Sequence, residues 1–90
     1  MREHILKTLP DYWAAVETRE KTFEVRRDDR GFQKGDVLVL RRLKKNPSGV
    51  WYEDRSQDSY HDLRRKVVYV LTGGQLGIEP GYVVMAIRPA

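Results

Sequence analysis

Two strand-like segments, 36–40 and 66–71, have apolar residues at successive positions, and they limit the choice of fold more than anything else in the chain. Side chains alternate between the two faces of a strand, so a strand that is apolar on both faces must be covered on both sides. A chain of 90 residues forms one domain with a single core. An open sheet with a single helix packed on it would leave its other face exposed to solvent. The pattern therefore predicts a closed or nearly closed small barrel.

The remaining segments predict an α+β fold, a small mixed β-barrel of five to six strands with one or two short helices. The expected strands are 4–9, 21–26, 36–40, 50–52, 66–71 and 82–88. From Leu9 to Val16, apolar residues recur at the spacing of one helix face, which indicates a short helix ending near Thr18. Residues 46–49 read as a hairpin turn. No repeat or linker divides the chain, so residues 1–90 are expected to form one domain.

The segment 21–26 is the most informative for function. As a strand, it places the apolar residues Phe23 and Val25 on one face. The opposite face carries three hydrogen-bonding side chains: Thr22, Glu24 and Arg26. Such a face is either a solvated surface or the floor of a polar cleft.

Ionisable residues surround this strand, between two apolar segments. We identify five of them as candidate binding residues: Lys21, Glu24, Arg26, Asp29 and Arg30. A buried Glu24 would need a cationic partner, because burying an unpaired carboxylate is costly. The set is therefore either an ion-pair network that closes one end of the barrel or a polar cleft that recognises a base or a phosphate.

Three short basic clusters, 41–42, 44–45 and 64–66, form one basic face if the hairpin and the following strand lie side by side. With interleaved acids they are instead an ordinary solvated face. The candidate nucleic-acid-binding residues in this region are Arg41, Arg42, Lys44, Trp51 and Tyr52. A base stacked on an aromatic side chain contributes about 1–3 kcal/mol, although these rings suit barrel packing equally well.

Composition removes several classes of function. The net charge of +4, from 17 Lys+Arg and 13 Asp+Glu, suits a polyanionic partner without requiring one. There is no cysteine, the two histidines lack a second ligand at a suitable spacing, and neither a phosphate-binding loop nor a nucleophilic serine motif is present, so no metal or cofactor is predicted. No apolar run approaches the roughly 20 residues of a membrane span, and the first residues do not resemble a signal peptide. We expect a cytoplasmic monomer that does not contact membranes.

Several motifs, in order, resemble those of the ASCH domain group, a branch of the PUA-like barrels. Lys21-x-x-Glu24-x-Arg26 matches the end of the group's Gly-x-Lys-x-x-Glu-x-Arg signature. Within the group, the chain is similar to an uncharacterised subfamily of small bacterial and phage proteins, through residues 4–7, 29–36 and 81–85. The signature's leading glycine is Arg19 here. That glycine would end the helix in a left-handed conformation, which costs another residue roughly 1 kcal/mol.

The resemblance implies a PUA-like β-barrel whose cleft, beside the first helix, binds RNA or nucleotides. Some relatives are enzymes, and one type deacetylates acetylated cytidine with a lysine, a threonine and a distant glutamate. Its lysine aligns with Lys21, its threonine position holds Glu24, and the distant glutamate has no secure counterpart. Another relative is a ribonuclease, whose catalytic set is not recognisable here.

Two functions follow as hypotheses. In a binding module, an unpaired base or modified nucleoside enters the cleft, Lys21 and Arg26 meet a phosphate or carbonyl, and Glu24 accepts from an exocyclic amine. In a hydrolase acting on a modified nucleoside or RNA, Glu24 is the general base and Lys21 stabilises the oxyanion. A carboxylate beside two cations is a weak base, which favours the binding module. A protein-interaction domain is a third possibility on which the sequence is silent.

Overall fold

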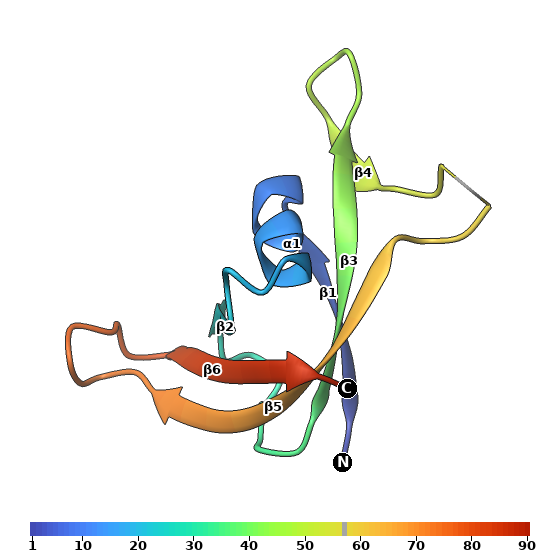
Figure 1. Cartoon of the computed structure of the whole chain (residues 1–90). Helices are drawn as coiled ribbons and strands as arrows, with labels where there is room; N and C mark the ends of the chain where they lie inside the picture. The colour runs from blue at the N-terminus through green and yellow to red at the C-terminus, as the bar shows by residue number, and fades with distance from the viewer. Residues whose placement is uncertain (57) are drawn as a thin grey trace.

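The structure of the chain is a computed structural model that describes residues 1–56 and 58–90 (Figure 1). Its elements, in chain order, are β1 (Glu3–Thr8), α1 (Pro10–Glu17), β2 (Phe23–Arg27), β3 (Val37–Lys45), β4 (Trp51–Glu53), β5 (Asp62–Thr72) and β6 (Tyr82–Pro89). Six strands form one mixed sheet, and one short helix accompanies them, which confirms the α+β class. In the described ranges no helix is long and apolar enough to cross a membrane.

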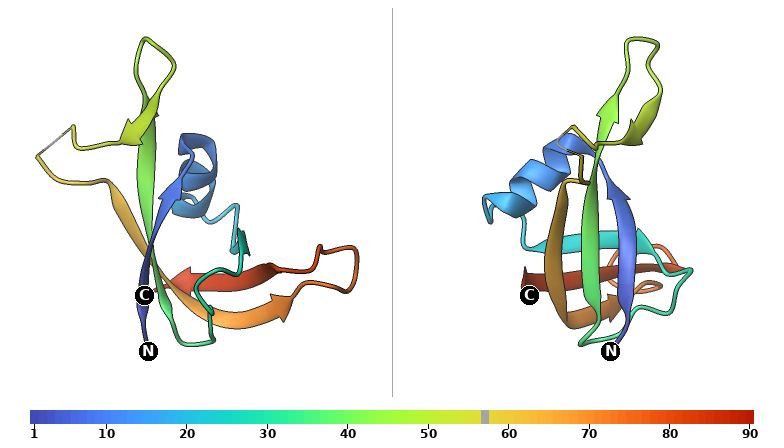
Figure 2. Two further views of the ribbon diagram at one scale, coloured as in Figure 1. Left: turned by 180° about the vertical axis from the view of Figure 1, so that it is seen from behind. Right: turned by 90° about the vertical axis from the view of Figure 1, so that its right-hand side faces the viewer.

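The sheet is curled but open. Its strand order is β1-β3-β5-β6-β2, with β4 paired to β3 beside this path, and the β1–β3 pair is parallel whereas the others are antiparallel. The two edge strands, β1 and β2, do not pair with each other in the described part of the chain, so backbone pairing does not close a barrel. Figure 2 shows β1 and β3 crossing β2 and β6 at a steep angle, with β5 curving from one layer into the other. The register shift between Val67 and Tyr69 lies in β5, where a bulge bends the strand.

The core lies inside the curl. Side chains from the inner faces of four strands pack there with the buried face of α1, represented by Leu6, Leu38, Val67, Met85 and Trp13. The Trp13 indole donates a 2.9 Å hydrogen bond to a main-chain oxygen of β3, which fixes α1 against the inside of the sheet.

Only one of the two apolar segments is covered on both sides. All residues from Val37 to Leu40 are buried, as expected. On the outside of β3, an ion pair between Glu3 of β1 and Arg64 of β5 (2.6 Å) links the strands that flank it. Their long side chains shield the outer valines. The expectation for 66–71 was wrong, because Tyr69 on the outside of β5 is 62% exposed and the helix lies on the other side of the sheet.

The start of β5 and the end of α1 also differ from expectation. β5 begins at Asp62, four residues before the apolar run, because its first residues pair with β3 in the register Arg41↔Asp62. The helix ends at Glu17, close to the expected stop, and Arg19 follows with a φ of 66°. Arg19 therefore adopts the left-handed conformation that a glycine would take at lower cost.

Candidate functional site

A cleft of about 680 Å³ lies where the end of β1, the helix α1 and the edge strand β2 meet. Its lining residues are Lys7, Thr8, Leu9, Tyr12, Ala15, Glu20, Lys21, Phe23, Glu24, Val25 and Arg26. The structure therefore brings three of the candidate residues, Lys21, Glu24 and Arg26, together beside the first helix.

Glu24 is the charged centre of the cleft. It is only 3% exposed, so the polar face of β2 turns inward. One carboxylate oxygen accepts a hydrogen bond from Lys21 Nζ at 2.5 Å, and the other accepts from Arg26 Nε at 2.9 Å. Two cations thus compensate the buried carboxylate, which would otherwise be strongly destabilising.

Arg26 also spans the seam, by which we mean the gap between the edge strands β1 and β2. Its Nη1 donates to the main-chain oxygen of Lys7 at 3.1 Å, and its Nη2 donates to Thr8 Oγ1 at 3.2 Å. Its guanidinium is therefore fixed on both strands at once. The contacts tie β1 to β2 through a side chain instead of a backbone ladder.

Lys21 lies between two aromatic rings. Its ammonium is 5.6 Å from the ring centre of Tyr12 and 5.0 Å from that of Phe23, both within the range of cation–π attraction. It also donates to the main-chain oxygen of Phe23 at 2.8 Å. With one N–H on Phe23 and one on Glu24, the ammonium retains one donor for a ligand.

The free edge of β2 adds main-chain groups to the cleft. Thr22 accepts from Ile87 and Asp28 donates to Gly81, so the even-numbered residues of this strand direct their N–H and C=O groups to β6. The groups of Val25 therefore point the other way, toward the cleft. No strand of the described chain pairs with them there.

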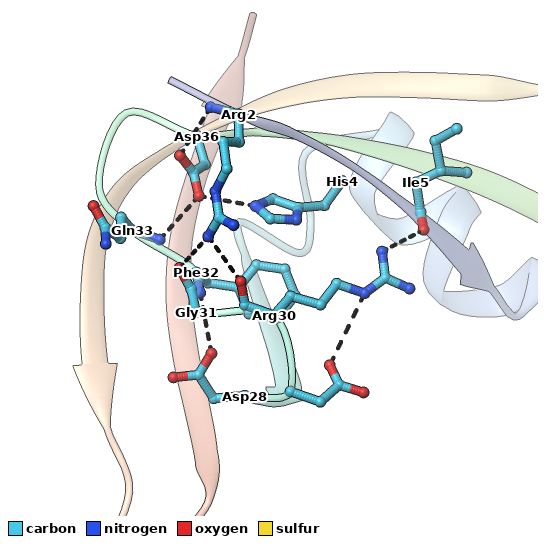
Figure 3. Close-up of polar contacts among 10 residues, drawn as sticks. Arg2, His4, Ile5, Asp28, Arg30, Gly31, Phe32, Gln33 and Asp36 are labelled. Atoms are coloured by element: carbon cyan, nitrogen blue, oxygen red, sulfur yellow. Dashed lines mark hydrogen bonds and ion pairs between the residues drawn. The ribbon is translucent and has the colours of Figure 1, made fainter.

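Asp29 and Arg30 lie outside the cleft, in the loop between β2 and β3. Their mutual contact is a long, exposed ion pair of 3.9 Å. Arg30 Nη1 donates to the main-chain oxygen of Ile5 at 2.8 Å, so this arginine also crosses the seam (Figure 3). Its observed role is to hold the edge of β1.

The same loop is fastened by a buried carboxylate, Asp36 (Figure 3). It accepts hydrogen bonds from His4 Nε2 at 2.9 Å, from Gln33 N at 3.0 Å and from Arg2 N at 3.2 Å. Burial alone would raise the pKa of Asp36, but these three hydrogen bonds outweigh it and hold the pKa below its usual value. His4 thus has a structural role.

The two arginines at the base of the hairpin are already paired. Arg41 Nε contacts Asp62 at 3.0 Å, and its guanidinium lies 3.7 Å from the ring centre of Tyr60. Arg42 Nη2 contacts Asp54 at 2.8 Å. With Arg64 paired to Glu3, the basic clusters are interleaved with acids, which matches the solvated-face interpretation for these arginines.

The tip of the hairpin is more open. Lys44, Trp51 and Tyr52 lie on β3 and β4, the arm that projects beyond the rest of the sheet in Figure 1. Both aromatic side chains are exposed, and Lys45 lies 5.4 Å from the ring centre of Trp51. These rings therefore do not pack inside the sheet, as the alternative interpretation required. They do not line the cleft either.

One constellation escaped the sequence analysis because its loop has no periodic pattern. His61 Nδ1 lies 3.1 Å from Arg42 Nη2, and His61 Nε2 lies 2.9 Å from Ser56 Oγ. An arginine can only donate, so Nδ1 accepts and the ring proton sits on Nε2, pointing at the serine. His61 therefore cannot take the Ser56 proton, and the arrangement does not form a nucleophilic dyad.

The Arg42 hydrogen bond lowers the pKa of Asp54 to about 2.

Sequence reasoning missed most of the other lining residues, including the exposed apolar side chains of Tyr12, Phe23 and Val25. Tyr12 fitted the apolar face of the helix, and Phe23 and Val25 formed the apolar face of their strand, so the pattern did not indicate a ligand contact at any of the three. Their exposure, 44% for Phe23 and 50% for Val25, depends on the edge position of β2. No signal in the local sequence reports that position.

The described residues contain no group of three or more metal-ligating side chains arranged to hold an ion. A family model described as a domain of unknown function, DUF3850, matches residues 3–87. No curated protein matches the chain.

Proposed function

This chain belongs to that family, whose description assigns no activity, and we propose that it is an RNA- or nucleotide-binding module. An unpaired base or a modified nucleoside would enter the cleft beside α1. The observation that carries the proposal is the Lys21–Glu24–Arg26 core, whose lysine lies beside the exposed rings of Tyr12 and Phe23. A flat ligand can stack there and meet both a donor and an acceptor.

Each part of the cleft has a task in this proposal. The rings of Tyr12 and Phe23 provide stacking surfaces, which bind any base through its face. The remaining lone pairs of Glu24 accept from an exocyclic amine, and the remaining N–H of Lys21 donates to a neighbouring ring nitrogen or carbonyl. The main-chain groups of Val25 offer a further donor and acceptor. A base edge with an amine beside an acceptor, as in cytosine or adenine, satisfies this set.

The contacts of Arg26 assign it a positioning role. Its donors serve Glu24, Lys7 and Thr8, so it orients the carboxylate and leaves phosphate binding to other cations. Lys44 and Lys45 on the projecting hairpin carry no ion pair in the described structure. With Trp51 beside them, they are suited to follow the backbone of a bound strand.

We also propose that the curled sheet is a nearly closed PUA-like barrel of the ASCH type. The arginines that span the seam support this, because Arg26 and Arg30 contact β1 where a closed barrel would have a backbone ladder. The proposal includes action as a cytoplasmic monomer without a cofactor.

The hydrolase alternative has less support. Both oxygens of Glu24 already accept hydrogen bonds from Lys21 and Arg26, so the observed contacts engage the carboxylate in holding the cleft together. Turnover of acylated nucleosides or RNA that is lost in Glu24→Gln, with binding retained, would favour the enzyme over the binding module.

The proposal is tested by amide NMR titration with a panel of nucleosides, modified nucleosides and short single-stranded RNA. Shifts should concentrate at α1 and at residues 20–26. Tyr12→Ser removes an exposed ring and should weaken binding roughly 5- to 150-fold, the equivalent of one stacked base. Lys21→Met should also weaken binding, whereas Lys34→Met, which removes an exposed lysine elsewhere, should not.

Two results would contradict the proposal. One is the absence of shifts around the cleft with every ligand in the panel. The other is unchanged affinity in Tyr12→Ser, a variant that should fold normally because the ring it removes is exposed.

A further inference from the structure

The outside of β5, β6 and β2 carries a continuous apolar surface. Residues opposite each other in an antiparallel pair share a face, so the register aligns Phe23, Ala86 and Tyr69 in one row. A second row joins Val25, Val84 and Leu71. We call the surface formed by these six residues, with Tyr82 at its end, the outer face. The helix packs on the inner side, so the described structure leaves the outer face open to solvent.

The unpaired charges around the outer face all have one sign. The charged side chains that share its side of these three strands are Arg27, Asp62, Arg64, Lys66 and Arg88. Asp62 is paired with Arg41 and Arg64 with Glu3, whereas the three remaining cations have no ion pair among the described residues. Arg27 sits beside Tyr82 at one end of β6, and Arg88, paired in register with Lys66, sits at the other. Six residue-to-residue steps along β6 separate Tyr82 from Arg88, about 20 Å at the usual rise per residue.

The outer face is continuous with the cleft. Phe23 and Val25 belong to both, because β2 is an edge strand whose side chains reach the cleft as well as the outside of the sheet. A chain that leaves the cleft can therefore pass directly over β2.

We propose that the outer face is a second nucleic-acid surface, over which a single-stranded RNA continues after one base has entered the cleft. This inference rests on the proposed function. With the cleft base on Phe23, a following base would stack on Tyr69, which at 62% is the more exposed ring. Phosphates would lie near Arg27 at one end and near Lys66 and Arg88 at the other.

Charge and ring content favour RNA over the two other occupants. A second copy of this chain would bring one cationic rim against another, which is repulsive. An acidic protein surface would match the charges, but it would leave unexplained why the aromatic rings begin at the wall of the cleft. A strand of RNA satisfies both features, since it carries a negative charge and a stacking face on every nucleotide.

The test compares a mononucleotide with a single-stranded RNA of about ten nucleotides, within the usual site size for such surfaces. Wild-type protein should bind the longer RNA more tightly. Tyr69→Ser should lose roughly 5- to 150-fold of affinity for the longer RNA and none for the mononucleotide. Arg88→Gln should reduce the slope of log affinity against log salt by about 0.7, the value for one phosphate contact on a single strand.

Matched controls separate the outer face from the rest of the surface. Leu76→Ser replaces an apolar side chain that is 82% exposed at the tip of the β5–β6 loop, and it should leave both affinities unchanged. Lys34→Gln removes an exposed cation outside the face and should leave the salt slope unchanged.

Failure of the inference is distinguishable from failure of the proposed function. If the mononucleotide binds in the cleft but the longer RNA gains nothing, or if Tyr69→Ser binds it normally, the outer-face inference is overturned and the cleft stands. If the mononucleotide does not bind, both are overturned. Equal binding of an acidic peptide at Tyr69 and Arg88, or self-association that Tyr69→Ser abolishes, would assign the face to another occupant and overturn the inference.

Discussion

Arg26 offers the sharpest test of how the cleft is held together. We predict that Arg26→Met, which keeps the aliphatic stem and removes every donor, lowers the free energy of unfolding by about 3–5 kcal/mol. That is the usual cost of breaking a buried ion pair while leaving one charge behind. The charge left behind is Glu24, which is 3% exposed and would retain only Lys21. A chain of this length has a total stability of roughly 5–14 kcal/mol, so the loss is a large fraction of it.

The matched control is Arg30→Met. Arg30 also crosses the seam, by one hydrogen bond to Ile5, but among the described residues its only ion pair is the exposed contact with Asp29. We expect its loss to cost about 0.5–1.5 kcal/mol, the net value of one hydrogen bond. Urea unfolding at neutral pH measures both. With a slope of about 2 kcal/mol per molar, the midpoint should fall by about 1.5–2.5 M for Arg26→Met and by less than about 0.8 M for Arg30→Met.

A second substitution identifies the cause. If the buried charge dominates, Glu24→Met in the Arg26→Met background should recover part of the lost stability, because the unpaired carboxylate is then gone. Equal losses in the two arginine variants, or a double variant less stable than Arg26→Met, would refute the reasoning. In that case the bonds from Arg26 to β1, not its pairing with Glu24, would account for the effect.

Two further predictions concern residues outside the cleft. Asp54 should titrate near pH 2 in a carboxyl NMR experiment, against an ordinary value of 3.8, and Arg42→Met should return its midpoint toward that value. Since the pKa is lowered in the folded state, the stability it contributes is complete above about pH 4 and is lost as the pH falls toward 2, which acid unfolding of the two proteins would reveal. Arg19→Gly should raise the free energy of unfolding by about 1 kcal/mol and the melting temperature by about 4–8 °C, because Arg19 has a φ of 66°, which glycine adopts at lower cost. An unchanged or lower melting temperature would show that the left-handed conformation costs nothing here.

Much of the local structure could be predicted from the sequence. The helix was placed within about one residue of its observed end, and the strands around residues 23–27 and 82–89 were expected close to where they lie. Lys21, Glu24 and Arg26 were expected together with Asp29 and Arg30, because ionisable residues are dense in this segment and the first three match the ASCH-like signature. Only the first three line the cleft. Closure of the barrel was not found, because the edge strands β1 and β2 do not pair in the described part of the chain. The two-sided burial expected for 66–71, on which the barrel prediction rested, fails at the exposed Tyr69.

The amino-acid sequence by itself determined the elements and the residue types of the candidate site, since strand alternation and helix periodicity depend on neighbours only a few positions away. Only the tertiary structure decided what those residues do. It turned Glu24 inward, fixed Arg26 and Arg30 on a strand some twenty residues earlier, and left Phe23 and Val25 open at a sheet edge. These outcomes follow from which strands become edges and where β5 bends. Such features are set by packing between segments distant in the chain, and no short window of sequence records them.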